Sequence, residues 1–271
     1  MKVFVGWAVL ACFICTVLVG GSVFGKSGVV YEEYDLWGSD LYDFDPWPST
    51  NIDDMVSTEP YFPNEHHWDL VYRLSDGIAS YKIRIGGWWE CGVLIKDEEG
   101  IRDLATSYSF TIVSAAYDAS GDDSMDKFMW GLAGIVRNES DFDRCALGTK
   151  PRKVAYKRGL LKRNKRSISH TEDEVLAVVE SKVTQRIFRK TGFDLGTGQL
   201  LSRFYPDRKD FKVMMSLEGS TEEAARNLKK RSKYHRTKRP WLHWRGTKRC
   251  NWYAEKVERY AARLGANTED I

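Results

Sequence analysis

The feature that most constrains this chain is a run of basic residues near its middle. Residues 150–166 hold nine Lys and Arg and no acidic residue. Like charges at this density repel one another and resist burial, so we expect a solvated linker here. It separates an acidic part, residues 26–149, with 9 basic and 24 acidic side chains, from a basic part, residues 167–271, with 22 basic and 14 acidic ones. The net charge of +3 for the whole chain conceals this division.

The linker also carries pairs of basic residues of the kind that proteases of the secretory pathway cleave. Downstream of them, Thr171-x-x-Glu174 predicts a capping box at the start of a helix, which leaves Arg166 in a loop. We predict cleavage after Arg166 by a dibasic processing protease, and a nucleic-acid-binding patch is the alternative for the same residues. The candidate processing pairs are Lys157-Arg158, Lys162-Arg163 and Lys165-Arg166.

The amino terminus has the layout of a secretory signal peptide. Lys2 precedes an uncharged run at residues 3–19, and small residues follow as far as Gly25. This order of a charged segment, an apolar segment and small residues is what signal peptidase recognises. We expect residues 1–25 to be removed and the protein to be secreted, with an uncleaved membrane anchor as the alternative, because a bilayer crossing needs ~20 apolar residues.

Three cysteines remain after removal of the signal: Cys91, Cys145 and Cys250. In an oxidising compartment this odd number predicts one disulfide and one thiol that is free or paired with another chain, and the sequence leaves all three pairings open. The sequon at Asn138 is a candidate glycosylation site, which is compatible with secretion.

The acidic part divides into a lead segment and a folded segment. Residues 26–65 are rich in acids, aromatics and prolines, and we expect them to be largely disordered or to cover a basic surface. Residues 66–149 show short alternating runs separated by the turn residues Ser75-Asp76-Gly77 and Gly86-Gly87, which predict an antiparallel sheet. Residues 104–117 fit a buried strand or a core helix, and residues 124–136 fit a helix. The expected strands are residues 68–74, 80–85 and 90–96.

The basic part is predicted to alternate helices with one hairpin. Apolar residues recur at helical spacing in residues 172–190, and a second helix is expected to begin at a cap on Ser220. Together the two parts predict an α+β fold of antiparallel sheets with packed helices, divided into two processed parts. The other elements expected here are a hairpin of residues 199–205 with 211–217 and a last helix at residues 252–264.

A basic surface with interleaved aromatic residues is expected between Arg226 and Arg249. This segment holds eleven basic residues and no acid. Such a composition fits an anionic membrane or polysaccharide on a target cell, or nucleic acid as a weaker alternative. The candidate contact residues are Lys229, Lys230, Arg231, Lys233, Arg236, Trp241 and Trp244.

No catalytic motif, metal-ligand spacing or cofactor motif is evident in the chain. His66 and His67 are adjacent and lack a zinc-ligand spacing. The segment Gly196-Thr197-Gly198 lacks the lysine of a phosphate loop and predicts a turn before a strand. The sequence therefore predicts neither a metal nor a cofactor, and it leaves enzymatic activity unsupported.

The chain has a signal peptide, an acidic part, a basic linker with Lys157-Arg158, Lys162-Arg163 and Lys165-Arg166, and a basic part, in this order. This layout resembles the precursors of secreted fungal killer protoxins. The resemblance implies a two-chain toxin whose chains stay associated, bind the surface of another cell and damage its membrane or enter it. A secreted prohormone acting through a receptor, and an uncut basic protein that binds nucleic acid or polysaccharide, are the alternative functions.

Processing gives the first testable prediction. Mass spectrometry of the secreted product should show two chains, one ending at Arg166 and one beginning at Ser167, because the linker is accessible and dibasic. Replacing Lys165 and Arg166 by Gln should leave a single chain. A single intact mass from the unmodified protein would contradict both the toxin and the prohormone hypotheses.

Overall fold

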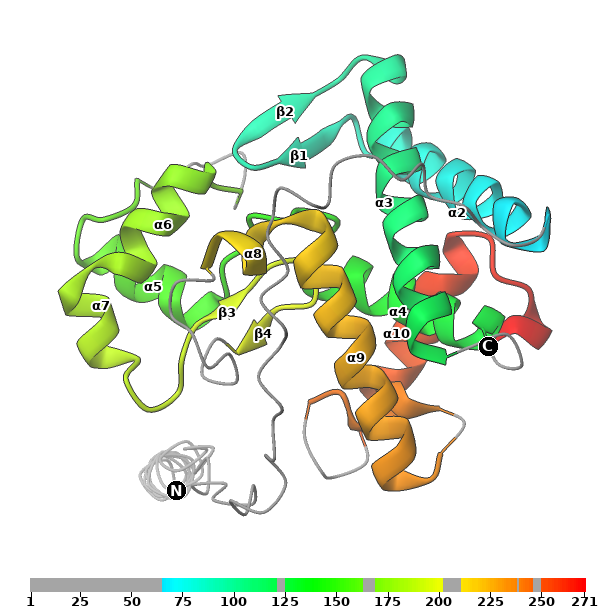
Figure 1. The fold of residues 1–271 in the computed structure, drawn as a ribbon. Helices are drawn as coiled ribbons and strands as arrows, with labels where there is room; N and C mark the ends of the chain where they lie inside the picture. Colours follow the sequence, from blue (N-terminus) through cyan, green and yellow to red (C-terminus); the bar gives the residue numbers. More distant parts are fainter. Residues whose placement is uncertain (1–64, 121–124, 163–168, 202–210, 238, 246–249) are drawn as a thin grey trace, which may run out of the picture. The chain divides into compact units, whose positions relative to one another are not determined.

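The computed structural model describes residues 65–120, 125–162, 169–201, 211–237, 239–245 and 250–271, all within one compact unit (Figure 1). Most of them are helical, and each of two small antiparallel sheets has two strands, so the predicted α+β class holds in this loose sense. In this part of the chain no helix combines the length and apolarity needed to cross a membrane. The predicted signal peptide and almost all of the lead segment lie outside the described residues.

The elements follow one another along the chain in a simple order. They are α2 (Glu65–Arg84), β1 (Trp88–Glu90), β2 (Val93–Ile95), α3 (Glu98–Ser120), α4 (Met125–Glu139), α5 (Thr149–Lys157), α6 (Glu172–Glu180), α7 (Lys182–Ile187), β3 (Asp194–Leu195), β4 (Leu200–Leu201), α8 (Phe211–Met215), α9 (Leu217–His235), α10 (Asn251–Arg263) and the 3-10 helices η6 (Pro240–His243) and η7 (Thr268–Asp270).

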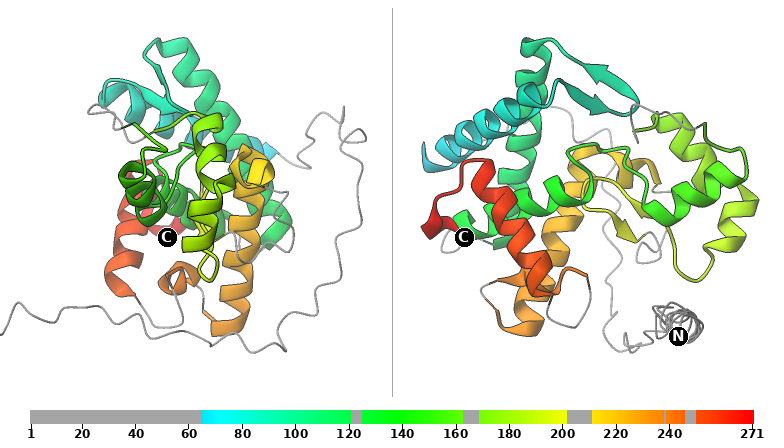
Figure 2. Two further views of the ribbon diagram at one scale, coloured as in Figure 1. Left: turned by 90° about the vertical axis from the view of Figure 1, so that its left-hand side faces the viewer. Right: turned by 180° about the vertical axis from the view of Figure 1, so that it is seen from behind.

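The larger hydrophobic core is built by helices from both sides of the basic linker. Helix α3 packs against α2, α4 and α9, and α10 packs along α4, which Figure 2 shows from behind. Trp130 on α4, Leu228 on α9 and Tyr253 on α10 are all fully buried in this core. Residues on either side of the predicted cleavage site therefore stabilise one another by burying apolar surface.

The strands expected at residues 68–74 and 80–85 are wrong, because α2 covers both segments. Its buried residues recur every three or four positions, at Leu70, Leu74 and Ile78, which is helical spacing. Gly77, expected in a turn, lies inside this helix. The position needs a glycine, because a Cβ there would be 1.9 Å from the backbone oxygen of Leu264. The glycine permits close packing of two backbones and does not end the element.

Residues 104–117, which fitted either a strand or a core helix, belong to α3. The helix expected at residues 124–136 is confirmed as α4, and the strand expected at residues 90–96 survives in part as β2, which pairs with β1. The antiparallel sheet expected in the acidic part is thus one short hairpin.

The second hydrophobic core lies around the β3–β4 hairpin and helices α5, α6 and α8. It includes Leu147, Ala155, Val179, Leu195 and Met215. The turn predicted at Gly196-Thr197-Gly198 is confirmed, because β3 and β4 pair across it.

Residues 211–217 do not form the predicted strand. They form α8, which buries Phe211, Met214 and Met215 at helical spacing, and then begin α9. The cap of α9 is Ser216, whose hydroxyl accepts a hydrogen bond from the Gly219 amide, and the predicted cap Ser220 lies inside the helix. The whole loop of the expected hairpin, and residues 202–205 of its first strand, lie outside the described residues.

The helix predicted at residues 172–190 is two helices, α6 and α7, which meet at Ser181. The extended backbone of Ser181 ends α6 and begins α7. The capping box at Thr171 and Glu174 is confirmed, with both of its hydrogen bonds present. The final helix is confirmed as α10, which ends at Arg263.

The expectation of a solvated linker over residues 150–166 is wrong for its first half. Helix α5 begins at Thr149 and buries Pro151 and Ala155, and Leu161 beyond it is also buried. The charged side chains lie on the outer side of the helix, so the apolar residues among them decide its packing. Residues 163–168, with Arg163, Lys165 and Arg166, lie outside the described residues.

Helices α4 and α10 approach closely because α4 has glycine at their contact. A Cβ on Gly134 would lie 2.5 Å from the backbone oxygen of Val257, and one on Gly131 would lie 2.4 Å from the ring of Trp241. A backbone contact of this kind cannot be relieved by moving a flexible side chain.

Replacing Gly134 with Ala should therefore destabilise the protein by about 1–3 kcal/mol, although alanine favours helix formation over glycine. Urea unfolding monitored by circular dichroism would measure the change. Lys127→Ala, at a partly exposed position of the same helix, is the control and should leave stability within about 0.5 kcal/mol of the parent. A stabilised Gly134→Ala protein would contradict the described contact of α4 with α10.

Candidate active site

Glu139 is the last residue of α4, and its carboxyl group is enclosed by hydrogen-bond donors. Its side chain is only 10% exposed. The Tyr253 hydroxyl donates a hydrogen bond of 2.6 Å to Oε1, and the Asn138 amide nitrogen donates one of 3.1 Å. Arg245 places a guanidinium nitrogen 3.3 Å from Oε2. A carboxylate at the C-terminus of a helix is repelled by the partial negative charge there, and these donors offset the electrostatic cost.

A second carboxyl group faces the same site from β3. Burial, and then the negative charge of Glu139, raise the pKa of Asp194 to about 6, while Lys150 and Arg245 act in the opposite direction. The backbone oxygen of Asp194 accepts a hydrogen bond of 2.9 Å from the Gly148 amide, which fixes β3 against the start of α5. Asp194 therefore holds its proton to a higher pH than an ordinary aspartate does.

Cationic and aromatic groups border the two acids. The guanidinium of Arg245 lies 5.2 Å from the ring centre of Tyr253 and 5.8 Å from that of Trp252. The Trp252 ring is 59% exposed, and Lys150 is also exposed. Two largely enclosed carboxyl groups thus lie beside the cations Arg245 and Lys150 and near an exposed tryptophan.

The loop from Asp141 to Gly148 joins the end of α4, where Glu139 lies, to the start of α5, where the Gly148 amide bonds the backbone of Asp194. Its first two residues, Asp141 and Phe142, both have positive φ angles, 57° and 58°, which end α4 with a sharp change of direction. Phe142 is fully buried, and its carbonyl accepts a hydrogen bond of 2.8 Å from the Trp88 indole. Lys82 donates to the carbonyl of Asp141 at 2.6 Å. The strained start of the loop is thus held by packing and by two donors.

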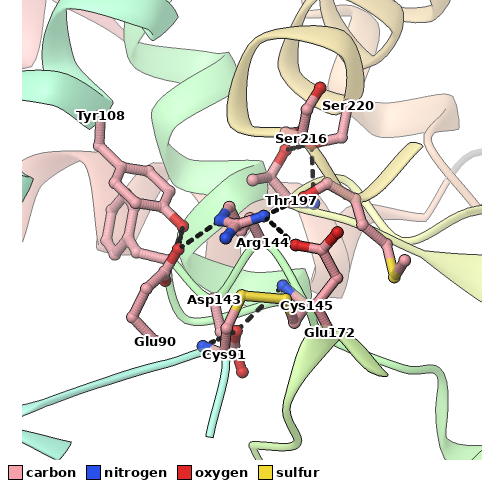
Figure 3. A network of polar contacts seen from close by, with 12 residues as sticks. Glu90, Cys91, Tyr108, Asp143, Arg144, Cys145, Glu172, Thr197, Ser216 and Ser220 are labelled. Carbon is pink, nitrogen blue, oxygen red and sulfur yellow. Dashed lines mark hydrogen bonds and ion pairs between the residues drawn. A yellow bond between two sulfur atoms is a disulfide. The ribbon is translucent and has the colours of Figure 1, made fainter. Parts of the chain in front are cut away.

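A disulfide and a buried aspartate fix the middle of the loop (Figure 3). Cys91 and Cys145 are bonded, which selects one of the three pairings that the sequence left open and leaves Cys250 outside it. One carboxylate oxygen of Asp143 accepts from the backbone amides of both cysteines, at 3.1 and 3.0 Å. Among the described residues these three side chains are close enough for a metal, but the disulfide removes both thiolates as ligands.

Arg144 is the centre of the polar network drawn in Figure 3. Its guanidinium lies 3.3 Å from Glu90 and 3.0 Å from Glu172, and it donates to the Met215 carbonyl at 3.2 Å. The Tyr108 hydroxyl donates to both oxygens of Glu90. The Arg144 side chain thus joins the loop that carries Cys145 to the β1–β2 hairpin through Glu90, to α6 through Glu172 and to α8 through Met215.

The β3–β4 turn is attached to the same loop. Gln199, at a positive φ of 51°, donates its amide to the Ala146 carbonyl at 2.8 Å. Thr197 exchanges hydrogen bonds with Ser220 and Thr221 on α9. These hydrogen bonds hold the hairpin that carries Asp194 against α9 and against the loop that follows Glu139.

The basic surface expected between Arg226 and Arg249 loses its two tryptophans, whereas Tyr234 stays exposed. Trp241 is fully buried and Trp244 is 7% exposed, so the prediction that they stack on a partner is wrong. The 3-10 helix η6 turns Trp241 inward, where its indole donates to Glu258 at 2.8 Å. Arg231 is half-buried and donates to the His243 carbonyl. Of the candidate contact residues, Lys229, Lys230, Lys233 and Arg236 are exposed, on α9 and at its C-terminal cap.

The remaining predicted residues have separate positions. Lys157 ends α5 and Arg158 is its C-terminal cap, so this pair has helical rather than extended backbone. Lys162 follows α5 without regular structure. Asn138 is half-buried and donates to Glu139, so the predicted glycosylation site adjoins the candidate active site.

Comparison with protein-family models, with curated proteins and with solved structures finds no match to this chain. The site therefore rests on its own geometry. Sequence reasoning missed both Glu139 and Asp194, since they are 55 positions apart and no motif joins them. One signal was present: an acid closes α4, where the helix dipole favours a base.

The Arg144 network makes stability depend on pH. Burial, and then the charge of Asp143, raise the pKa of Glu90 from 4.5 to about 8. The folded state thus binds this proton more tightly than the unfolded state, and the stabilisation is complete below pH 4.5 and lost as the pH rises to about 8. We expect Glu90→Gln, which stays neutral and can still accept from Tyr108, to become more stable relative to the parent between pH 5 and pH 8.

Urea unfolding of both proteins at several pH values would measure this difference. Glu180→Gln, at an exposed position, is the control and should follow the parent at every pH. A constant difference between Glu90→Gln and the parent would contradict the raised pKa.

Proposed function

We propose that this protein cleaves a glycosidic bond with the carboxyl groups of Glu139 and Asp194. The observation that carries the proposal is the electrostatic interaction between the two: after burial, the charge of Glu139 helps to raise the pKa of Asp194 to about 6, and Glu139 itself is enclosed by hydrogen-bond donors. Glycosidases use a protonated carboxylic acid and a carboxylate on opposite sides of the scissile bond. Below about pH 6 Asp194 carries the proton that such an acid donates.

In this reaction the protonated carboxyl group gives its proton to the glycosidic oxygen as the bond from that oxygen to the anomeric carbon breaks. The charged carboxylate stabilises the positive charge that develops on the sugar ring. Water then supplies the new hydroxyl group and returns a proton to the pair. Tyr253 and Arg245 hold Glu139 in place, and the Gly148 amide holds the strand of Asp194.

A sugar polymer also fits the border of the site. The apolar face of a pyranose ring stacks on an exposed indole, and Trp252 offers one beside Arg245. The cations Arg245 and Lys150 favour a polymer that carries negative charge. Export and action on the surface of other cells, expected from the sequence, remain part of the proposal, because extracellular polysaccharides are the substrates such an enzyme would meet.

The expected two-chain form is also retained as a proposal. A cut after Arg166 would place Glu139 on one chain and Asp194, Arg245 and Tyr253 on the other. The larger core contains helices from both chains, which supports their continued association after cleavage without an interchain disulfide.

Replacing either acid tests the proposed reaction. Glu139→Gln and Asp194→Asn should each lower the release of soluble fragments from insoluble polysaccharides, such as chitin and bacterial cell walls, by about 100-fold or more. Mass spectrometry of the soluble fraction would measure it. Glu255→Gln, an exposed acid on α10, is the matched control and should retain full activity.

The pH profile and a second substrate sharpen this test. Activity of the parent should fall above about pH 6, as Asp194 loses its proton. Asp194→Asn, which lacks the proposed proton donor, should keep activity on a nitrophenyl glycoside, because its leaving group needs no proton. Glu139→Gln, which lacks the proposed carboxylate, should not. Full activity of both variants on every substrate would overturn the proposal.

A further inference from the structure

A pocket of about 450 Å³ lies where three helices end, apart from the two acids of the candidate active site. Arg84 is the last residue of α2, Arg263 is the last residue of α10, and Arg137 is in the last turn of α4. The other residues that line it are Tyr81, Ile85, Tyr260 and Leu264. Its volume is within the range of small-molecule sites.

One of the three arginines is already engaged in the protein. Arg137 pairs with Asp141 at 2.8 Å and donates to the Tyr81 hydroxyl. Its guanidinium lies 4.1 Å from the ring centre of Tyr81 and 4.7 Å from that of Tyr260. Arg137 therefore forms part of the pocket wall with its aromatic neighbours and contributes charge.

The other two arginines have no such partner. Within the described residues no carboxylate pairs with Arg84 or Arg263, and both side chains are exposed at the pocket. Lys256 adds a further positive charge 5.5 Å from the ring centre of Tyr260. The negative charges at this place are Asp141 and the C-terminal ends of the three helices, and each helix end carries roughly half a negative charge. Together they do not balance the positive charges of the three arginines and Lys256.

We infer that this pocket binds an organic oxyanion: a phosphate, sulfate or carboxylate group attached to a flat ring. The planar guanidinium groups of Arg84 and Arg263 match the paired oxygens of such a group. The Tyr260 ring and the apolar side chains of Ile85 and Leu264 provide the surface on which the attached ring packs. This site does not depend on glycan cleavage at Glu139.

Isothermal titration of the full chain with phenyl phosphate, phenyl sulfate, benzoate and inorganic phosphate tests the inference and ranks the three oxyanions. Saturable binding of at least one aryl oxyanion is expected. Phenyl phosphate should bind more tightly than inorganic phosphate, because only the former has a ring. The double variant Arg84→Gln/Arg263→Gln should weaken binding of the best probe by about tenfold or more.

Matched variants separate a built site from general attraction of anions. Arg186→Gln/Arg189→Gln removes the same charge from exposed positions on and just after α7 and should leave the affinity unchanged. Tyr260→Leu should reduce the preference for phenyl phosphate over inorganic phosphate. Equal loss in both double variants, or no saturable binding by the parent at millimolar concentrations, would overturn the inference.

Discussion

The loop from Asp141 to Gly148 is the constraint on which the rest of this structure depends. It leaves α4 through two residues with positive φ, passes the disulfide at Cys145 and reaches α5 beside β3. Burial raises the pKa of Asp143, and its charged form is nevertheless stabilised by two backbone amides and by Ser169. Because the loop is bound at nearly every residue, it fixes the end of α4, which carries Glu139, and the start of α5, where the Gly148 amide bonds the strand of Asp194.

The distribution of charge along the chain acquires a spatial meaning in the fold. Glu139, from the acidic part, is held by Arg245 and Tyr253, from the basic part. Arg144 in the acidic part likewise pairs with Glu172 beyond the linker. Attraction between the parts thus works through individual ion pairs within one unit, and buried apolar surface contributes more to their association than net charge does.

The two proposed sites use arginine differently. At the candidate active site Arg245 pairs with a carboxylate and stabilises it in place. At the oxyanion pocket Arg84 and Arg263 have no carboxylate partner among the described residues, while Arg137 is fixed between two tyrosine rings. Guanidinium groups that lack an internal acid are available to an external one, and this difference separates a positioning role from a binding role.

What the sequence by itself determined was local. The capping box at Thr171 follows from side chains three positions apart, and α4 and α10 follow from apolar residues at helical spacing. The same reasoning failed at Gly77, which was read as a turn. It also failed at Trp241, which was read as a surface residue. In each case a residue far away in the chain decides the outcome. Gly77 packs against the Leu264 backbone, and Trp241 packs against Gly131 and donates to Glu258.

The tertiary structure alone decided the disulfide partner of Cys145, the burial of Trp241 and Trp244 in the basic segment and the interaction of Glu139 with Asp194. Each of these depends on residues that are far apart in the chain and are brought together by packing. A linear pattern records which residues are apolar, charged or able to cap a helix. It does not record which of them meet, because that is set by the cooperative burial of the whole core.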